Sequence, residues 1–140
     1  MLCCTAYTIQ IFNAMHIPSK NVLDEWMRQT DGTKRRLLSL CGDGLIRMAV
    51  TEQASLTKDK SNHLADRIVQ CLSDRVLTRV YKSWAHSDHV LPNECKPSVY
   101  MKAHVYCLYL YNRPACGMMV EHIMETANIP FENANYFISK

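Results

Sequence analysis

Hydrophobic residues recur along most of the chain at spacings of three and four positions, which is the spacing of an amphipathic α-helix. The pattern predicts helices over residues 4–16, 21–29, 33–55, 61–84 and 98–127, the last range being a pair of helices joined by a short turn. The chain has only four glycines and five prolines in 140 residues, which leaves little material for a turn-rich β architecture. We therefore expect one all-α domain over residues 1–140, ending in a polar and aromatic tail over residues 128–140.

The predicted helix over residues 33–55 is apolar on two sides. Its first apolar face consists of Leu37, Leu40, Cys41, Leu45 and Met48. Its second apolar face consists of Leu38, Ile46, Ala49 and Val50. A helix of this kind is expected at the centre of a fold, packed by its own domain on one side and by a partner chain on the other. We predict that the second face is the one that meets a partner.

A narrow polar stripe separates these two faces. Ser39, Asp43 and Arg47 follow one another at a spacing of four residues, and this spacing favours an ion pair between Asp43 and Arg47. Gly42 and Gly44 flank the acid, although each glycine in a helix interior costs roughly 1 kcal/mol relative to alanine. Both glycines therefore need an explanation.

The predicted helix over residues 61–84 combines a core face with a basic face. Its apolar residues fall within an arc of about 120° at 100° per residue. They are Ala65, Ile68, Val69, Leu72, Val76 and Val80. A neighbouring arc of similar width holds Arg67, Arg75, Arg79 and Lys82, which makes this face the candidate contact for a polyanion such as RNA.

Charge and hydropathy narrow the class of protein only modestly. The net charge of +3 permits a nucleic-acid partner without requiring one. No apolar run approaches the roughly 20 residues of a membrane span, so we expect no membrane partner. The first acidic residue is Asp24, and an acid-poor N-terminus is a feature of mitochondrial import sequences. The alternative compartment is the cytoplasm.

Cysteine and histidine offer few candidates for catalysis or metal binding. The odd count of seven cysteines, with no C-x-x-C pair, favours free thiols in a reducing compartment over a zinc site. A thiol nucleophile at Cys41 or Cys107, assisted by His104, competes with the simpler interpretation that both cysteines are small buried hydrophobes. The cluster at residues 86–89, "HSDH", is expected to be a solvated loop rather than a ligand set.

Several segments resemble the ribonuclease III family in order and spacing. "LLSLCGDGLIRMAVTEQ" is similar to the family's signature helix, which reads approximately E-R-L-E-F-L-G-D-A-V-L-R-x-x-V-x-E. "NAMHIPSKN" resembles the segment before that helix, and "NHLADRIVQCLSD" resembles the helix that follows it. "VYMKAHVYCLYLYNRPACGMMVEHI" resembles the family's late helix pair. The length resembles that of the Mini-III branch, which is the bare domain.

The resemblance implies a fold with a central, buried signature helix, and an activity that this chain has lost. Family enzymes cleave double-stranded RNA with magnesium held by four carboxylates, two on the signature helix and two on the late helix. Asp43 matches one of them, whereas Ser39, Val99 and Lys102 occupy the other three positions. No Asp or Glu occurs between Glu94 and Glu121. The resemblance therefore implies a pseudoenzyme without a metal or other cofactor, in which Gly42 admits an adjacent helix and Asp43 pairs with Arg47 or Lys102.

These features together predict a non-catalytic, RNA-associated structural protein. It would pair with another ribonuclease III-like chain inside a ribonucleoprotein assembly, in contact with structured RNA and neighbouring proteins. The resemblance points to the large subunit of a mitochondrial ribosome. Three alternatives remain open: a non-catalytic partner in an RNA-processing or RNA-editing complex, a divergent magnesium-dependent nuclease, and an unrelated helical adaptor.

Overall fold

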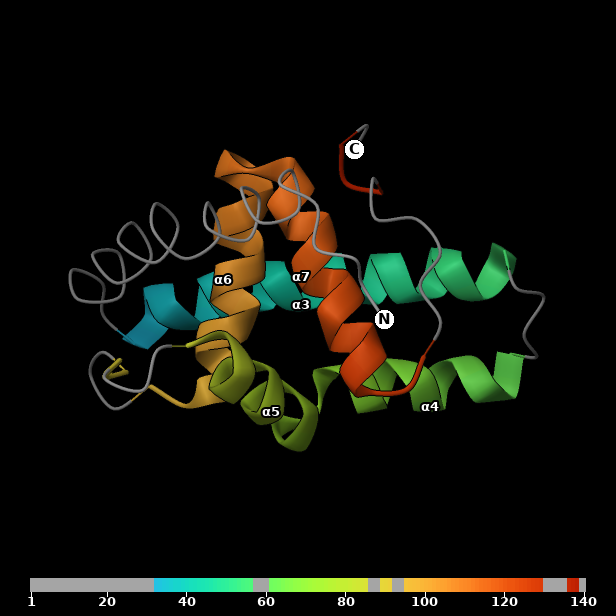
Figure 1. Cartoon of the computed structure of the whole chain (residues 1–140), viewed down its shortest axis with the longest axis horizontal. Coiled ribbons are helices and arrows are strands. Elements are labelled where there is room, and N and C mark those ends of the chain that lie inside the picture. Colours follow the sequence, from blue (N-terminus) through green and yellow to red (C-terminus); the bar gives the residue numbers. More distant parts are fainter. Residues whose placement is uncertain (1–31, 57–60, 86–88, 92–94, 130–135, 139–140) are drawn as a thin grey trace.

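The computed structural model describes residues 32–56, 61–85, 89–91, 95–129 and 136–138. Within these residues all regular secondary structure is helical and no strand is present, which confirms the predicted all-α class. The helices are α3 (Gly32–Leu56), α4 (Ser61–Leu72), α5 (Asp74–Trp84), α6 (Pro97–Tyr111) and α7 (Arg113–Thr126), as Figure 1 shows. The helices expected over 4–16 and 21–29 lie outside the described residues. None of the described helices is long and apolar enough to cross a membrane.

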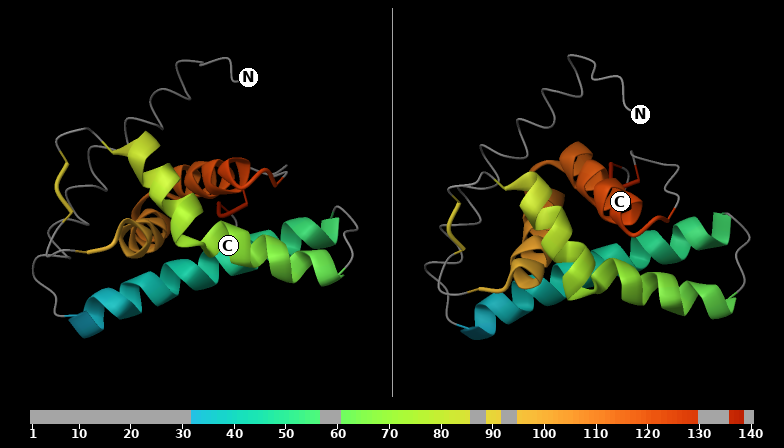
Figure 2. Two further views of the ribbon diagram at one scale, coloured as in Figure 1. Left: turned by 90° about the horizontal axis from the view of Figure 1, so that it is seen from below. Right: turned by 60° about the horizontal axis from the view of Figure 1, so that its bottom comes forward.

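The longest helix, α3, lies along one side of the described helices, and one of its faces is exposed rather than buried at the centre as expected. Figure 1 shows α6 and α7 lying across it, and Figure 2 shows α4 running back alongside its second half. The most extensive contact between two helices is the one between α3 and α6. The helix predicted over residues 33–55 is thus observed as α3, one residue longer at each end, and it is packed against the late helix that follows Pro97.

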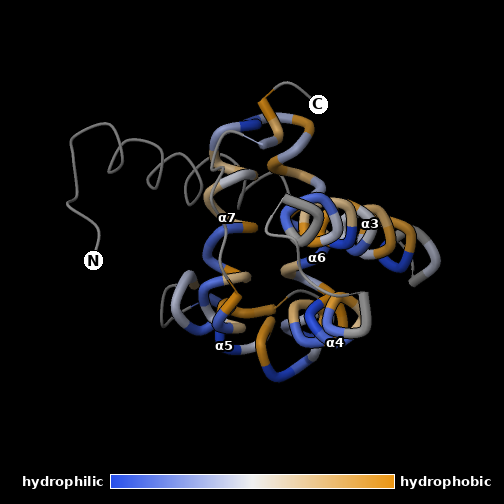
Figure 3. Tube along the Cα trace, turned by 90° about the vertical axis from the view of Figure 1, so that its right-hand side faces the viewer, coloured by the Kyte–Doolittle hydropathy of each residue, from blue (hydrophilic) through white to orange (hydrophobic). Residues whose placement is uncertain are grey.

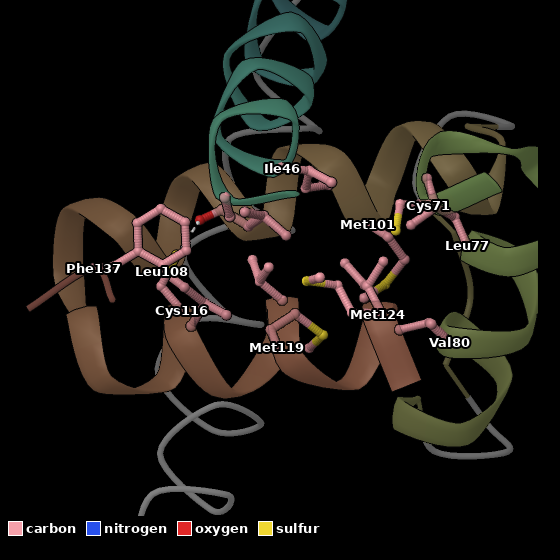
Figure 4. Packing of buried hydrophobic residues seen from close by; sticks show 14 of the residues in the cluster. Ile46, Cys71, Leu77, Val80, Met101, Leu108, Cys116, Met119, Met124 and Phe137 are labelled. Carbon is pink, nitrogen blue, oxygen red and sulfur yellow. Dashed lines mark hydrogen bonds between the residues drawn. The ribbon is translucent and has the colours of Figure 1, made fainter. Parts of the chain in front are cut away.

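The core fills the space between these helices. Figure 4 shows Ile46 of α3 and Met101 of α6 pointing towards Met119 and Met124 of α7. Twelve residues of α6 and α7 belong to this core, so both helices are buried over much of their surface. Figure 3 shows hydrophilic and hydrophobic residues alternating along α3, α4 and α5, as expected for helices with one exposed side.

The described end of the chain also belongs to the core. Tyr136 and Phe137 are buried, although the sequence suggested only a polar and aromatic tail after residue 127. Arg113 secures this segment by donating from Nη1 to the carbonyl oxygen of Phe137 at 3.1 Å. The ring of Tyr109 lies edge-on to Phe137, with 6.0 Å between the ring centroids. Phe137 therefore packs where α6 ends and α7 begins.

The prediction of one continuous helix over residues 61–84 is wrong. Ser73 has an extended backbone (φ −67°, ψ 148°) and separates α4 from α5. Its hydroxyl accepts a hydrogen bond from the backbone N–H of Val76 at 3.2 Å and donates one to the carbonyl oxygen of Gln70 at 2.8 Å. The two bonds pair a backbone carbonyl at the end of α4 and a backbone N–H at the start of α5, which would otherwise lack partners. The chain changes direction at Ser73, as Figure 2 shows.

The break also divides the predicted apolar arc of residues 61–84. Val76 and Val80 of α5 are buried in the core. On α4, however, Ala65 is exposed and Val69 is 68% exposed, while Ile68 and Leu72 are half-buried. A single helical wheel cannot predict which residues are buried before and after Ser73, because α4 and α5 point in different directions.

Candidate functional site at the crossing of α3 and α6

Gly42 is the point at which α3 and α6 come closest. A Cβ atom built on Gly42 would lie 1.7 Å from the carbonyl oxygen of Lys102 and 2.5 Å from its carbonyl carbon. Real side chains cannot occupy that space, so any larger residue would push the two helices apart. The close packing expected at Gly42 is therefore observed, and it brings Lys102 directly over the polar stripe of α3.

Gly44 has different surroundings, although it is only two residues further along. A Cβ atom placed there would meet no atom of the described residues within 4 Å. Gly44 is exposed, as are Leu37, Leu40 and Cys41 on the same side of α3. Packing within the chain explains Gly42, but it does not explain Gly44.

Asp43 lies between two cations at the crossing. Its Oδ1 accepts a hydrogen bond from Nε of Arg47 at 2.5 Å, and its Oδ2 lies 3.3 Å from Nζ of Lys102. The predicted ion pair with Arg47 is confirmed, and the alternative partner Lys102 is also in place. The side chains of Asp43 and Lys102 are 18% and 19% exposed, whereas that of Arg47 is 56% exposed.

The charge at this crossing does not suit a divalent metal. Magnesium prefers several carboxylate oxygens, but this cluster holds one carboxylate and two cations and carries a net charge of +1. Ser39 and Val99 are half-buried and bring no negative charge. Over the described ranges, no group of three or more His, Cys, Asp or Glu residues could hold a metal ion.

The predicted basic face is divided between two helices. Arg75, Arg79 and Lys82 are exposed on α5, at spacings of four and three residues that place them on one side of that helix. Arg67 is half-buried on α4, beyond the break at Ser73. The structure therefore keeps three of the four cations together, about 10 Å apart from first to last along the helix axis.

The face of α3 that was expected to meet a partner chain packs inside this one. Ile46 and Ala49 have no exposed surface, Val50 is 1% exposed, and Leu38 is half-buried against the same core. Three of these residues belong to the core and Leu38 packs against it, so their assignment to an interface is corrected to the core. The apolar residues that remain accessible are Leu37 and Leu40 of the first face, at 57% and 58% exposure.

An aromatic and histidine cluster, which the sequence did not predict, joins α5 to α6. His89, expected in a solvated loop, is half-buried, and its Nδ1 lies 2.6 Å from the hydroxyl of Tyr81. Its ring also lies 5.2 Å from that of Tyr100, and the ring of Trp84 lies 4.5 Å from that of His104. Residues 86–88 of the predicted loop lie outside the described residues. The available signal was local: Tyr81 and Trp84 are three residues apart on α5, and Tyr100 and His104 are four residues apart on α6.

The cysteines divide into buried and exposed groups, and those that the structure describes form no disulfide. Burial raises the pKa of Cys71 to about 12 and that of Cys107 to about 11, which opposes formation of the thiolate nucleophile. Burial likewise raises the pKa of Cys95 and Cys116. Cys41 is exposed, so the interpretation of Cys41 as a buried hydrophobe is wrong.

A polar contact between side chains connects α5 to α7. Oγ of Ser83 lies 2.7 Å from Nε2 of His122, and the same hydroxyl donates to the carbonyl oxygen of Val80 at 2.9 Å. Burial lowers the pKa of His122, and the nearby Glu125 opposes this shift. The neutral imidazole is therefore favoured at the junction of the two helices.

The chain matches no protein-family model, and comparison with curated proteins and with solved structures gives no significant match.

Proposed function

We propose that the chain is a non-catalytic, ribonuclease III-like scaffold protein that associates with RNA. The observation that supports this proposal is the approach of α6 to α3 at Gly42, which sets Lys102 beside Asp43. In the family that the sequence resembles, the signature helix and the late helix bring their carboxylates together. Here the corresponding segments meet, but a lysine faces the single aspartate.

The chemistry of this crossing supports a role without catalysis. Hydrolysis of a phosphodiester by the two-metal mechanism needs enough negative charge to hold both metals. Asp43 is neutralised on both sides, by Arg47 and by Lys102. Because α6 carries no acidic residue, no second carboxylate can come from that helix.

The exposed cations of α5 supply the proposed contact with structured RNA. Arg75, Arg79 and Lys82 project from one side of a helix whose other side, including Leu77 and Val80, is fixed in the core. A rigid row of cations of this kind suits the phosphates of an RNA backbone, which are recognised by charge rather than by sequence. Arg67 would contribute from α4 only if the RNA extended across the break at Ser73.

The exposed side of α3 is the surface that we propose for pairing with a second ribonuclease III-like chain. Leu37 and Leu40 lie there beside Cys41 and Gly44. Among the described residues nothing fills the place of a side chain at Gly44, so another backbone could approach closely. We place the paired protein in a ribonucleoprotein assembly, namely the large subunit of a mitochondrial ribosome. This assignment rests on the resemblance of the sequence to the ribonuclease III family and on the acid-poor N-terminus.

Co-purification tests this proposal. The tagged chain is purified at moderate salt from its own cells, and the bound RNA and proteins are identified by sequencing and mass spectrometry. Ribosomal RNA and ribosomal proteins are expected with the wild type. Substitution of Arg75, Arg79 and Lys82 by Gln should lower the recovered RNA several-fold, because each lost phosphate contact weakens binding.

A matched control keeps the change in charge but moves it elsewhere. Lys96 is exposed where α6 begins, and Lys96→Gln removes one charge there, as Lys82→Gln does on α5. Equal loss of RNA from these two single variants would leave no special role for α5. An RNA-free monomer would overturn the proposal, and magnesium-dependent cleavage of duplex RNA that disappears in Asp43→Ala would support a nuclease instead.

A further inference from the structure

We propose that Arg47 and Lys102, held in place by Asp43, bind a phosphodiester group of RNA directly and without a metal ion. The inference deepens the proposed function, on whose RNA association it rests, and assigns a second contact besides the basic face of α5. It starts from the local charge, since two cations share one carboxylate. One positive charge is therefore left without a partner at the crossing of α3 and α6.

The remaining hydrogen-bond donors favour an anionic ligand. Arg47 uses Nε to reach Asp43, and within the described part of the chain its side chain makes no other hydrogen bond or ion pair. Its two terminal nitrogens therefore keep four N–H donors for a ligand. Lys102 makes a single ion pair through Nζ, and an ammonium group carries three donors.

Exposure and position make the same cluster accessible to a large ligand. The guanidinium of Arg47 is more than half exposed, while Asp43 and Lys102 each keep about a fifth of their surface in contact with solvent. Arg36 is also exposed and precedes Asp43 by seven residues, which places it on the same side of α3, about 10 Å away along the axis. A row of cations thus borders the crossing on a scale that suits consecutive phosphates.

A phosphodiester fits this cluster better than a metal-bound phosphate does, because the cluster already carries positive charge. Guanidinium and ammonium groups both bind phosphate oxygens with strong, charge-assisted hydrogen bonds. In a magnesium site the metal neutralises the phosphate, whereas here Lys102 would do so from a fixed point on α6. Asp43 is then a positioning residue, because it orients both cations and at the same time limits the affinity through its own negative charge.

Salt titration of RNA binding tests the inference. The probe is a fluorescein-labelled RNA duplex of about 20 base pairs, longer than the ~16 base pairs that a small double-stranded-RNA-binding domain contacts. Binding is followed by anisotropy in EDTA from low to moderate salt. Lys102→Met should weaken binding several-fold and reduce the slope of log K against log salt by about one unit. Arg47→Gln should act in the same direction. Asp43→Asn should tighten binding and steepen the slope, because it removes a repulsive charge and retains an oxygen acceptor for Arg47.

Two controls make this experiment decisive. Lys96→Met removes the same charge from the start of α6, about 9 Å along the helix axis from Lys102, and should change binding much less. Circular dichroism of each variant confirms that it is folded, and the exposed Arg47 provides a substitution that the fold should tolerate. Equal effects of Lys102→Met and Lys96→Met, or weaker binding by Asp43→Asn, would overturn the inference.

The outcomes also separate this inference from the proposed function. If the wild type does not bind the duplex at any salt concentration, the proposed RNA association itself fails. If the wild type binds and the triple Gln variant of α5 is impaired, but Lys102→Met is not, only the site at the crossing fails. Binding that requires magnesium would contradict the direct contact, since the proposed cations act without a metal.

Discussion

The two glycines of α3 differ in their surroundings, and this difference separates the two sides of the helix. Gly42 faces α6 so closely that the carbonyl oxygen of Lys102 occupies the place of a side chain. Gly44 faces open space, next to the exposed Leu40. Glycine therefore allows two helices of this chain to pack closely at one position and leaves an open surface at the other. The role of each glycine depends on the side of α3 that it occupies.

The largest expected effect is that of Gly42→Ala. The added methyl group would overlap the backbone of α6, and backbone cannot move aside as the end of a flexible side chain can. We expect a loss of about 3 kcal/mol or more in the free energy of unfolding, which is a large part of the total stability of a small domain. Urea denaturation followed by circular dichroism measures it.

Gly44→Ala is the matched control on the open side of the same helix. Nothing blocks its methyl group, so the higher helix propensity of alanine should stabilise the chain by up to about 1 kcal/mol. If both variants changed stability equally, the difference between the two sides would be disproved. A destabilising Gly44→Ala that depended on protein concentration would instead locate a partner on this side.

The second comparison concerns apolar residues on the two sides of α3. Ile46→Ala should cost about 3 kcal/mol, because Ile46 is fully buried among residues of α6 and α7. Leu40→Ala should cost less than about 0.5 kcal/mol in the isolated chain, since more than half of Leu40 is exposed.

Thermal unfolding of both variants at two protein concentrations checks this prediction. The cost of Ile46→Ala should be independent of concentration, as expected for a residue of the core. If Ile46→Ala were tolerated but changed the sedimentation of the protein, the predicted interface would regain support over the core assignment.

The helices that the sequence predicted well are those with clear ends. The late pair begins at Pro97 and contains Pro114 in its second member, and proline is favoured in the first turn of a helix. The break at Ser73 was missed because the apolar residues happen to continue at helical spacing across it. The signal was present nevertheless: Ser73 followed by Asp74 is a typical helix start, with an N-cap hydroxyl and an acid in the first turn.

The candidate site was predicted in part, for a physical reason. The pair between Asp43 and Arg47 lies within one helix, so its spacing alone was sufficient. The choice between the two sides of α3 could not be made from the sequence, because each side is apolar and each carries one glycine. Only the position of α6 decides it. The contact of His89 with Tyr81 and Tyr100 likewise depends on tertiary packing that no local pattern encodes.

The smallest expected effect is the dependence of stability on pH at the junction of α5 and α7. Burial lowers the pKa of His122 in the folded chain below its usual value of about 6.5, against the opposing charge of Glu125. The unfolded chain therefore takes up a proton at a higher pH than the folded chain does. His122 consequently contributes its full stability above about pH 6.5 and loses it as the pH falls through the folded pKa.

The His122→Gln variant isolates this contribution. Between pH 8 and pH 5.5 the melting temperature of the wild type should fall more than that of the variant, so that the difference between them narrows as the solution is acidified. Ser83→Ala is the matched substitution on α5, because it removes the hydroxyl at 2.7 Å but leaves the buried imidazole to titrate. It should therefore lower stability slightly and retain the pH dependence. If the melting temperatures of the wild type and His122→Gln changed equally with pH over this range, the prediction would be wrong. The imidazole would then have the same pKa in the folded and unfolded chains.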